Sequence, residues 1–390
     1  MNVAIIGAGI GGLTAAACLL RRGHTVRVYE QAHTLGEIGA GIQMSANATK
    51  VLNAIGLGET LEAIGVKPQA FEFRRFDTGE HLHRIPIGVR HAEMHGATYY
   101  QVHRGDLHAA LVSAVTSLAS EGIKLNMSAR RVEDGEKSAT VHFADGNSIE
   151  ADLVVGADGI KSVVRKSILG DDKPEFTGHV AWRLIVPTER IPPELRTEIV
   201  STVWCGPKNH AVTYYIRGGT LTNFVGCVAR PWEEESWSAS RPWGELDADY
   251  KGWHPMVRAI IEAADRDKCY RWALNNRKPA SLWSSRHVTL LGDAVHATLP
   301  YMAQGAAMAI EDAALLARAI DIDVPLEVAL RRYQDHRAPR TARVVYESTE
   351  MGSLYQIVDA DEMRKQFHDR DIAKSRNEWL YPYDPINVSF

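Results

Sequence analysis

The first thirty residues alternate between short apolar runs and one helical pattern. Asn2–Ile6 is a β-branched run, and Thr25–Tyr29 is a second apolar run. Between them, Leu13, Ala17 and Leu20 recur at the spacing of one helix face. This order predicts a β-α-β unit, which is the smallest piece of a doubly wound parallel sheet.

Further along the chain, the same reasoning predicts alternating elements and then a change of period. Up to residue 155 we expect helices over 46–55 and 106–120, hairpin strands over 71–76 and 82–87, and strands over 124–127, 139–143 and 153–155. From residue 178 the pattern has period two, with strands over 180–186, 198–204, 211–216 and 221–228. Because Pro or Gly separates these strands and no helical pattern intervenes, they predict an antiparallel sheet in a second domain.

The C-terminal third returns to helical patterns. We expect helices over 253–264, 305–320 and 326–350 around a buried strand at 288–291, then a charged stretch over 359–376. The aromatic cluster at 379–383 is expected to dock on the body or on a partner subunit. The predicted domains are a discontinuous nucleotide-binding domain (1–72, 98–175 and 276–350), a substrate domain (73–97 and 176–275) and a C-terminal helical tail (351–390).

Composition narrows the class of protein. Hydrophobic residues make up 45% of the 390 residues and charged residues 24%, as in ordinary globular proteins. Forty-four Lys and Arg against 48 Asp and Glu give a net charge of −4, so no basic excess points to nucleic acid. The chain shows no signal peptide and no apolar run long enough for a bilayer, and its four cysteines have no C-x-x-C spacing. We therefore expect a cytoplasmic protein without a metal site, a nucleic-acid partner or a membrane partner.

The first motif is G-x-G-x-x-G, formed by Gly7, Gly9 and Gly12. Gly7 permits a tight turn, Gly9 lets the backbone approach a pyrophosphate, and Gly12 lets the helix pack closely on the strand. Glu30 ends the second strand, where a carboxylate can accept a hydrogen bond from a ribose 2′-hydroxyl; a solvated surface charge is the alternative. The motif predicts a bound adenosine diphosphate, which could belong to NAD or to FAD.

Two later turns end apolar strands with glycine and one carboxylate. Asp158-Gly159 follows the strand at 153–155, and Gly292-Asp293 follows the strand at 288–291. Glycine permits a close backbone approach, and each aspartate can accept hydrogen bonds from a sugar-like hydroxyl. Alone, either turn would be a structural helix cap. Together with the glycine-rich first motif, these two turns match the arrangement of nucleotide-contacting turns in one family of proteins.

Through these three motifs, nearly the whole chain resembles the group A flavoprotein aromatic hydroxylases, which are single-component FAD monooxygenases acting on substrates such as salicylate, 6-hydroxynicotinate and 3-hydroxybenzoate. The resemblance implies an α/β fold like that of para-hydroxybenzoate hydroxylase. Such a fold has a Rossmann-like FAD-binding domain, an antiparallel β-sheet substrate domain and C-terminal helices. It also implies FAD as cofactor and NADH or NADPH as co-substrate.

The resemblance assigns several residues to the flavin. Gly305 opens a helix whose positive end would stabilise charge on reduced flavin; the alternative is a plain loop before a core helix. Gln43 stands beside the flavin where some relatives carry His, and His296 is interpreted as structural. The implied FAD contacts are Gly7, Gly9, Gly11, Gly12, Glu30, Gln43, Arg104, Asp158, Gly159, Asp293 and Gly305.

On the substrate side, His210 and Tyr214 are the candidate catalytic residues. Their spacing of four in a strand puts both on one face, where a His can accept a phenolic proton and a Tyr can orient the substrate. A similar pair lies at the substrate in related hydroxylases; a core His beside a packed Tyr is the alternative. Arg183, Pro300 and Tyr301 are candidate substrate contacts, and an FAD contact or a structural ion pair is the alternative for Arg183.

The implied reaction uses NAD(P)H and O2 to form a C4a-hydroperoxyflavin, whose distal oxygen attacks an electron-rich ring. The substrate class is a small hydroxylated aromatic or heteroaromatic carboxylic acid, 6-hydroxynicotinate-like or salicylate-like, as in aromatic catabolism. Loss of CO2, the choice between NADH and NADPH, and monomer or homodimer stay open. A flavin-binding oxidoreductase without oxygen insertion and a nicotinamide-only dehydrogenase are the alternatives.

Overall fold

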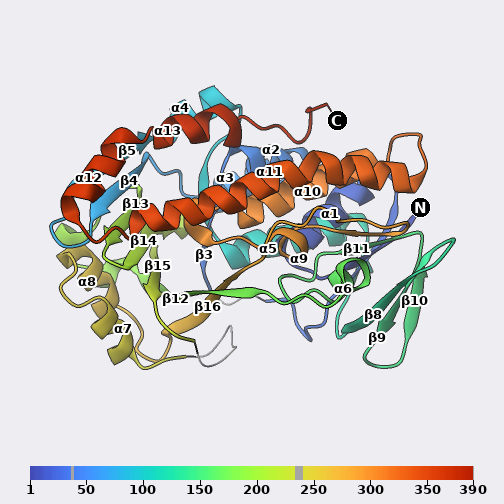
Figure 1. Ribbon diagram of the computed structural model, residues 1–390, viewed down its shortest axis with the longest axis horizontal. Coiled ribbons are helices and arrows are strands. Elements are labelled where there is room, and N and C mark those ends of the chain that lie inside the picture. Colours follow the sequence, from blue (N-terminus) through green and yellow to red (C-terminus); the bar gives the residue numbers. More distant parts are fainter. Residues whose placement is uncertain (37–38, 233–239, 390) are drawn as a thin grey trace.

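The computed structural model describes residues 1–36, 39–232 and 240–389. Figure 1 shows two large sheets side by side along the longest axis, with the long helix α11 (Leu326–Tyr355) crossing over both. Within the described residues, no helix combines the length and the apolar character needed to cross a membrane.

A five-stranded parallel sheet forms the nucleotide-binding half. Three of its strands, Asn2–Ile6, Leu153–Gly156 and Val288–Leu290, are largely apolar and almost completely buried, because helices cover both faces of such a sheet. Helix α1 (Ile10–Leu20) connects the first two strands, so the predicted β-α-β unit is confirmed. The strands, in spatial order, are β17 (Val288–Leu290), β11 (Leu153–Gly156), β1 (Asn2–Ile6), β2 (Thr25–Tyr29) and β7 (Ile123–Lys124).

A seven-stranded sheet forms the other half. The period-two block supplies four of its strands, and these four strands pair antiparallel as predicted wherever they adjoin. One pair in the sheet is parallel, because β4 arrives from the nucleotide-binding half and joins β13 at Ser201–Cys205. The strands, in spatial order, are β16 (Tyr270–Asn276), β12 (Glu175–Pro187), β15 (Leu221–Ala229), β14 (Asn209–Ile216), β13 (Ser201–Gly206), β4 (Ala70–Arg75) and β5 (His81–Pro86).

The two faces of this second sheet have different neighbours. One face packs on α7 (Trp243–Asp249) and α8 (Pro255–Glu262) through a core that includes Trp182 and Trp204. The opposite face looks toward the end of α11 and the nucleotide-binding half. Alternate residues of one strand therefore reach either a closed core or the interior between the halves.

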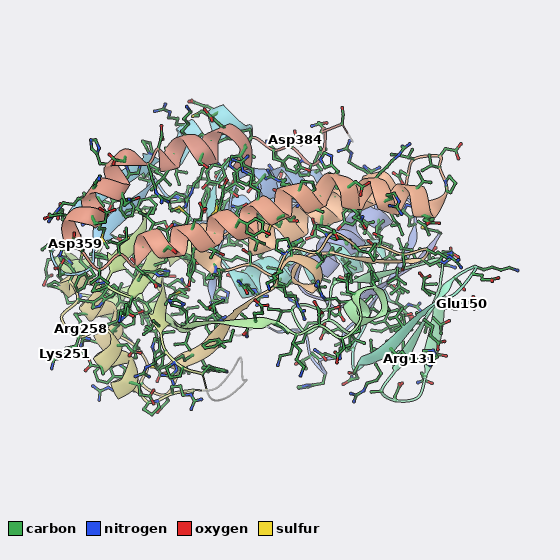
Figure 2. All side chains as sticks on the ribbon, in the orientation of Figure 1. Arg131, Glu150, Lys251, Arg258, Asp359 and Asp384 are labelled. Carbon is green, nitrogen blue, oxygen red and sulfur yellow. The ribbon has the colours of Figure 1, made fainter. Side chains whose placement is uncertain are left out.

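Some strands in the structure were not predicted from the sequence. Strands β8 (Ala129–Asp134) and β10 (Ser148–Ala151) form a three-stranded sheet with β9 (Ala139–Phe143), and both are polar and mostly exposed. Each buries only one residue, Val132 or Ala151, so neither carries a clear apolar periodicity. Figure 2 places Arg131 and Glu150 of this sheet at the opposite end of the molecule from Lys251 and Arg258.

The remaining elements are short strands and helices that surround the two sheets. They are β3 (Gly41–Met44), β6 (Tyr100–His103), α2 (Ala46–Ala54), α3 (Gly58–Ile64), α4 (Gly88–His95), α5 (Arg104–Leu118), α6 (Val163–Leu169), α9 (Asp293–His296), α10 (Gly305–Ala319), α12 (Ala360–Asp369) and α13 (Ile372–Ser375), with short helical turns such as Pro300–Met302.

The C-terminal segment docks on the body of the protein, as the aromatic cluster predicted. Leu380 and Tyr381 are completely buried, and the Tyr381 ring packs edge-on against His91 and His95 of α4. Arg340 of α11 donates to the carbonyls of Trp379 and Leu380. The segment thus closes over α11 and α4.

Candidate functional site

A cavity of about 410 Å³ lies between the two halves. Its walls come from the turn before α1, the β3 segment, the α9–α10 region and one face of the seven-stranded sheet. Residues 300 positions apart in the sequence, from Gly9 to Ala309, therefore meet around one space.

The glycines of the first motif have separate roles. Gly7 has φ +104°, and a Cβ there would lie 2.5 Å from the carbonyl oxygen of Ala157. A Cβ on Gly12 would lie 2.0 Å from the Gly7 carbonyl oxygen, so neither position accepts a side chain. Gly9 and Gly11 line the cavity, and a Cβ on Gly9 would meet nothing within 4 Å. Gly7 and Gly12 shape the turn, whereas Gly9 leaves room for a ligand.

Glu30 holds the same turn. Its carboxylate accepts hydrogen bonds from the backbone N–H of Ala8 (2.8 Å) and of Ala32 (2.9 Å). Glu30 is outside the lining of the cavity itself. Its present contacts therefore tie β2 to the glycine-rich turn.

The two residues of the second motif, Asp158 and Gly159, have different contacts. Asp158 accepts hydrogen bonds from Ser162 and from the amides of Val163 and Val164, so its carboxylate caps α6. Burial raises the pKa of Asp158, and these hydrogen bonds oppose the shift. Gly159, with φ +74° and open space around a notional Cβ, lines the cavity instead.

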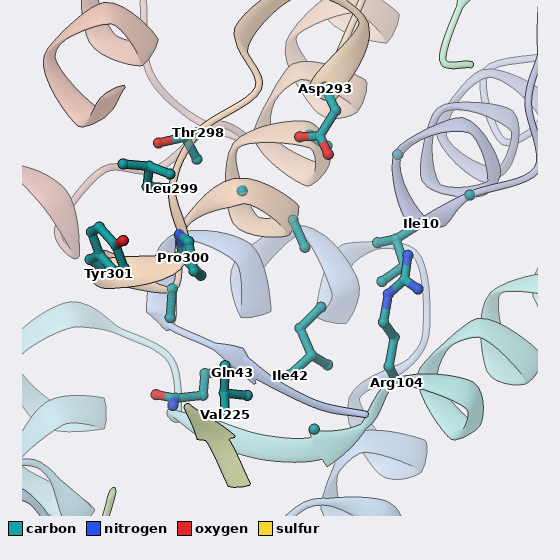
Figure 3. A pocket seen from close by; sticks show the side chains of 18 of the residues that line it. Ile10, Ile42, Gln43, Arg104, Val225, Asp293, Thr298, Leu299, Pro300 and Tyr301 are labelled. Carbon is teal, nitrogen blue, oxygen red and sulfur yellow. The ribbon is translucent and has the colours of Figure 1, made fainter. Parts of the chain in front are cut away.

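The third motif points its carboxylate into the cavity. Figure 3 shows Asp293 and Arg104 extending into the space from different elements. Asp293 is accessible from the cavity, yet protein surrounds it closely enough that burial raises its pKa, with His296 and Arg104 opposing. Gly305, at the first turn of α10, lines the same region. Three of the residues assigned to FAD therefore converge here.

The β3 segment forms one wall. Gln43 accepts a hydrogen bond from the Tyr99 hydroxyl (2.7 Å) and donates one to Ser201 Oγ of β13 (3.3 Å). A Cβ on Gly41 would lie 2.6 Å from the Tyr214 hydroxyl oxygen, so that phenol lies directly against the β3 backbone. Gln43 is 6% exposed and links β3 to the sheet rather than standing free.

The seven-stranded sheet supplies the other wall. His210, Val212 and Tyr214 all line the cavity, as period-two alternation requires. From the neighbouring strand, Val225 and Cys227 join them. Val212, Val225 and Cys227 were not predicted from the sequence; their positions two residues apart on adjacent strands were the signal that could have indicated them.

His210 is a buried, neutral imidazole. Burial lowers its pKa to about 3, and nearby His179 adds to the shift. The ring lies edge-on to Tyr301 and Tyr355, with centroid distances of 4.8 and 5.3 Å. Burial raises the pKa of Tyr214, although Arg183 and Gln43 oppose the shift, so the phenol stays protonated. The site thus offers an uncharged imidazole and a phenolic donor.

The remaining candidates also reach the cavity. Pro300 and Tyr301 form its edge in Figure 3, and the Tyr301 hydroxyl is buried without a hydrogen-bond partner among the described residues. Arg183 lines the cavity while its guanidinium stacks on the Trp272 ring, 3.9 Å from the centroid. Within the described part of the chain, no cluster of potential metal ligands occurs.

His296 lies behind the cavity rather than in it. Its Nε2 is 2.6 Å from Asp312, which is completely buried and also pairs with Arg337. The structural interpretation of His296 matches this location.

Comparisons with known proteins identify the family and relatives of this chain. A family described as FAD binding domain matches residues 1–348. The chain is 38% identical over 392 residues to 3-amino-4-hydroxybenzoate 2-monooxygenase of Streptomyces platensis, covering 99% of this chain and 97% of that protein. It is 39% identical over 349 residues to 6-hydroxynicotinate 3-monooxygenase of Bordetella bronchiseptica, covering 88% of this chain and 89% of that protein.

The fold has solved counterparts as well. Klebsiella pneumoniae HpxO, complexed with FAD and uric acid, superposes with a TM-score of 0.85 at 26% identity, covering 96% of this chain and 94% of that one. The para-hydroxybenzoate hydroxylase-like fold predicted from the motifs is thereby confirmed. Since the family match spans most of the sequence and the relatives align along nearly its whole length, this protein belongs to the FAD-binding-domain family, among flavin-dependent aromatic monooxygenases.

Proposed function

We propose that this protein hydroxylates a small hydroxylated aromatic or heteroaromatic carboxylic acid, using FAD, NADH or NADPH, and O2. The observation that carries the proposal is one cavity that joins the glycine-rich turn to the His210–Tyr214 face. A nucleotide cofactor at the first end would bring its reactive ring toward the second. A nicotinamide-only dehydrogenase would leave the Asp293 region without a purpose.

The residues present fit FAD. Gly9 and Gly159 line the cavity with open space where a side chain would stand, which suits a closely approaching pyrophosphate. The Asp293 carboxylate is an acceptor for ribityl hydroxyls, and Arg104 is a donor for the anionic cofactor. Thr298 Oγ1 is buried without a partner among the described residues and also lines this space. The donor set therefore matches a flavin dinucleotide.

Bound FAD would take electrons from NAD(P)H and deliver one oxygen atom from O2 to the ring. The first turn of α10 presents backbone N–H groups and the positive helix end to this region, which favours negative charge there. Leu299 and Ile42 contribute apolar wall and help exclude water.

His210 and Tyr214 would act on the substrate. Oxygen transfer to an aromatic ring is easier when a hydroxyl substituent loses its proton. The neutral His210 imidazole has a lone pair that can accept that proton, and the bound substrate must offset the burial that lowers the pKa of His210 to about 3. General-base assistance is typically worth about 10²–10⁴ in rate. Tyr214, kept protonated, can donate to a substrate oxygen.

The wall suggests a flat ring with one anionic substituent. Val212 and Val225 offer apolar surface, and Arg183 is a cation at the same wall. The two relatives named above act on 3-amino-4-hydroxybenzoate and 6-hydroxynicotinate, which are ring acids with a hydroxyl group. We extend that substrate class to this chain.

The test is an NADH and NADPH oxidation screen of the purified yellow protein over hydroxybenzoates, aminohydroxybenzoates and hydroxypyridinecarboxylates. Product masses are read for added oxygen, with or without loss of CO2. We expect at least one substrate to give product in proportion to the NAD(P)H consumed. Flavin reduction that yields only hydrogen peroxide with every compound would favour a flavoprotein that does not insert oxygen.

A further inference from the structure

A line of hydrogen bonds leads from His210 away from the cavity. Its Nδ1 is 3.1 Å from Nε2 of Gln356, the residue directly after α11. On the other side of the same carboxamide, Oε1 is 2.9 Å from Nε2 of His179. His210 is 1% exposed, whereas Gln356 and His179 are partly exposed. The line therefore joins the buried imidazole to one nearer the surface.

The far end of the line constrains the proton positions. His179 Nδ1 is 3.1 Å from the carbonyl oxygen of Thr177, which can only accept, so this nitrogen carries a proton. When His179 is charged, its Nε2–H donates to Gln356 Oε1, and the Gln356 amide donates to His210 Nδ1. When His179 is neutral, its Nε2 can only accept, so the carboxamide must present its NH2 to His179.

Turning the carboxamide changes what His210 offers the cavity. With the Gln356 oxygen facing His210, Nδ1 must carry the proton, and Nε2 keeps its lone pair. With the NH2 facing His210, Nδ1 accepts, and Nε2 carries the proton instead. Because Nδ1 is engaged by Gln356 in both arrangements, Nε2 is the nitrogen left for the cavity that His210 lines.

We propose that Gln356 is a positioning residue whose carboxamide selects the tautomer of His210 and couples that choice to the protonation of His179. Neutral His179 sets His210 as a proton acceptor, and charged His179 sets it as a proton donor. The inference rests on the proposed function only for its consequence in catalysis. In the catalytic proton transfer, the substrate O–H bond breaks and the proton forms an N–H bond at His210 Nε2. Gln356 Oε1 meanwhile accepts a hydrogen bond from Nδ1–H.

The other ionisable groups packed around His210 stay uncharged. From β13 and β15, Cys205 and Cys227 flank it, and burial raises the pKa of both thiols. From the 300–302 turn and α11 come Tyr301 and Tyr355, whose pKa values burial also raises. These thiols and phenols remain neutral near neutral pH, so they add no competing charge.

The backbone holds Gln356 where this role requires it. Its N–H donates to the Ser353 carbonyl (3.4 Å), and its own carbonyl accepts from Lys208 at the β13–β14 turn (3.3 Å). These contacts keep the α11 terminus against the strand that carries His210. A carboxamide turn needs only side-chain rotation and leaves them intact.

The direct test reads ring protonation in the FAD-loaded protein labelled with ¹⁵N-histidine. Two-bond ¹H–¹⁵N spectra show which nitrogen carries the proton, and a His210→Phe spectrum identifies the His210 signals. We expect the His210 proton on Nδ1 in spectra where His179 is neutral and on Nε2 in spectra where His179 is charged. Gln356→Leu should abolish this switch, and Gln356→Glu, which can only accept, should hold the proton on Nδ1. One unchanged tautomer across the titration in the parent, or a switch that survives in Gln356→Leu, would overturn the proposal.

Kinetics test the consequence with whichever ring acid the screen identifies. Gln356→Leu should lower kcat at least about tenfold at unchanged FAD content, because a misoriented base loses part of its effect. Gln356→Glu should retain turnover, because its carboxylate still accepts from His210 Nδ1–H. Gln366→Leu, at a partly exposed position of α12, is the matched control and should behave like the parent. Failure of hydroxylation altogether, with the tautomer switch intact, would reject the proposed function and leave the coupling standing.

Discussion

At the scale of single residues, three carboxylates that follow similar strand ends have different partners. Glu30 accepts from the amide of Ala8, Asp158 caps α6, and Asp293 points into the cavity. Each follows a buried apolar strand, so the sequence pattern treats them alike. The difference arises from the neighbouring backbone: free helix N–H groups lie beside Asp158, whereas Asp293 faces open space.

Asp293→Ala should weaken FAD retention, because it removes the one cavity-facing carboxylate of the three motifs. A lost hydrogen bond to a charged acceptor corresponds to about 1–3 kcal/mol, and equilibrium dialysis with flavin fluorescence measures it. Asp361→Asn, at a side chain that is 91% exposed, is the control. Full flavin content after dialysis would limit the third motif to a structural turn.

His210→Ala should slow hydroxylation by about 10²–10⁴ at normal FAD content, since the proton acceptor is lost. More NAD(P)H should then appear as hydrogen peroxide. Tyr214→Phe should mainly raise KM, and the double variant should be non-additive if both groups contact one substrate hydroxyl. Rates and coupling ratios from oxygen consumption measure these effects. If His210→Ala kept the rate and coupling of the parent, His210 and Tyr214 would be core-packing residues without a catalytic role.

At the scale of elements, strand alternation and helix length place the site. Strand β14 sends its even-numbered residues from 210 to 214 into the cavity and its odd-numbered Thr213 to the Trp204 indole on the other face. Helix α11 continues to Tyr355, five residues beyond the predicted end at 350, and so brings Tyr355 and Gln356 to His210. The aromatic tail then closes over α11.

Tyr381→Ala should destabilise the protein by about 3–5 kcal/mol, as for other large buried aromatic side chains. Tyr381 is 1% exposed and contacts the rings of His91, His95 and Tyr99. Tyr346→Ala, at a residue 62% exposed on α11, is the matched control. Urea unfolding measures both; equal midpoints would show that the tail contributes no stability.

At the scale of the whole molecule, a buried ionic cluster connects the cavity to the long helix. Glu311 and Asp312 on α10 pair with Arg337 of α11, and all three side chains are completely buried. Asp312 also accepts from the amide of Gly292, next to the cavity-facing Asp293. Breaking one member would leave an uncompensated charge in the interior.

Asp312→Asn should therefore lower the free energy of unfolding at neutral pH by about 3–5 kcal/mol. Burial acts to raise the pKa of Asp312, but His296 and Arg337 overcome it and hold the pKa at about 2, below the ordinary 3.8. A depressed carboxyl pKa stabilises the fold above the unfolded value and loses that effect as pH falls. The difference between parent and variant should thus narrow from about pH 4 toward pH 2 in urea titrations, with Asp361→Asn as control; a constant difference would contradict the ionic origin.

The sequence alone determined the strand–turn–helix units, the glycine-rich turns and the shared face of His210 and Tyr214. Each of these depends on residues a few positions apart, where backbone sterics and the periods of helix and strand decide the outcome. Gly7 and Gly12 illustrate this, since the turn itself excludes a side chain at either position.

The tertiary structure alone decided which of these features share a cavity. The α6 cap on Asp158, the ionic cluster behind Asp293 and the line from His210 through Gln356 to His179 depend on chain segments that pack against one another. Gln356 carries no pattern of its own, being a polar residue at a helix end. Its proposed role depends on the contact between the end of α11 and β14. Contacts between residues this far apart in sequence depend on how the two sheets and α11 pack together, and local periodicity does not encode that packing.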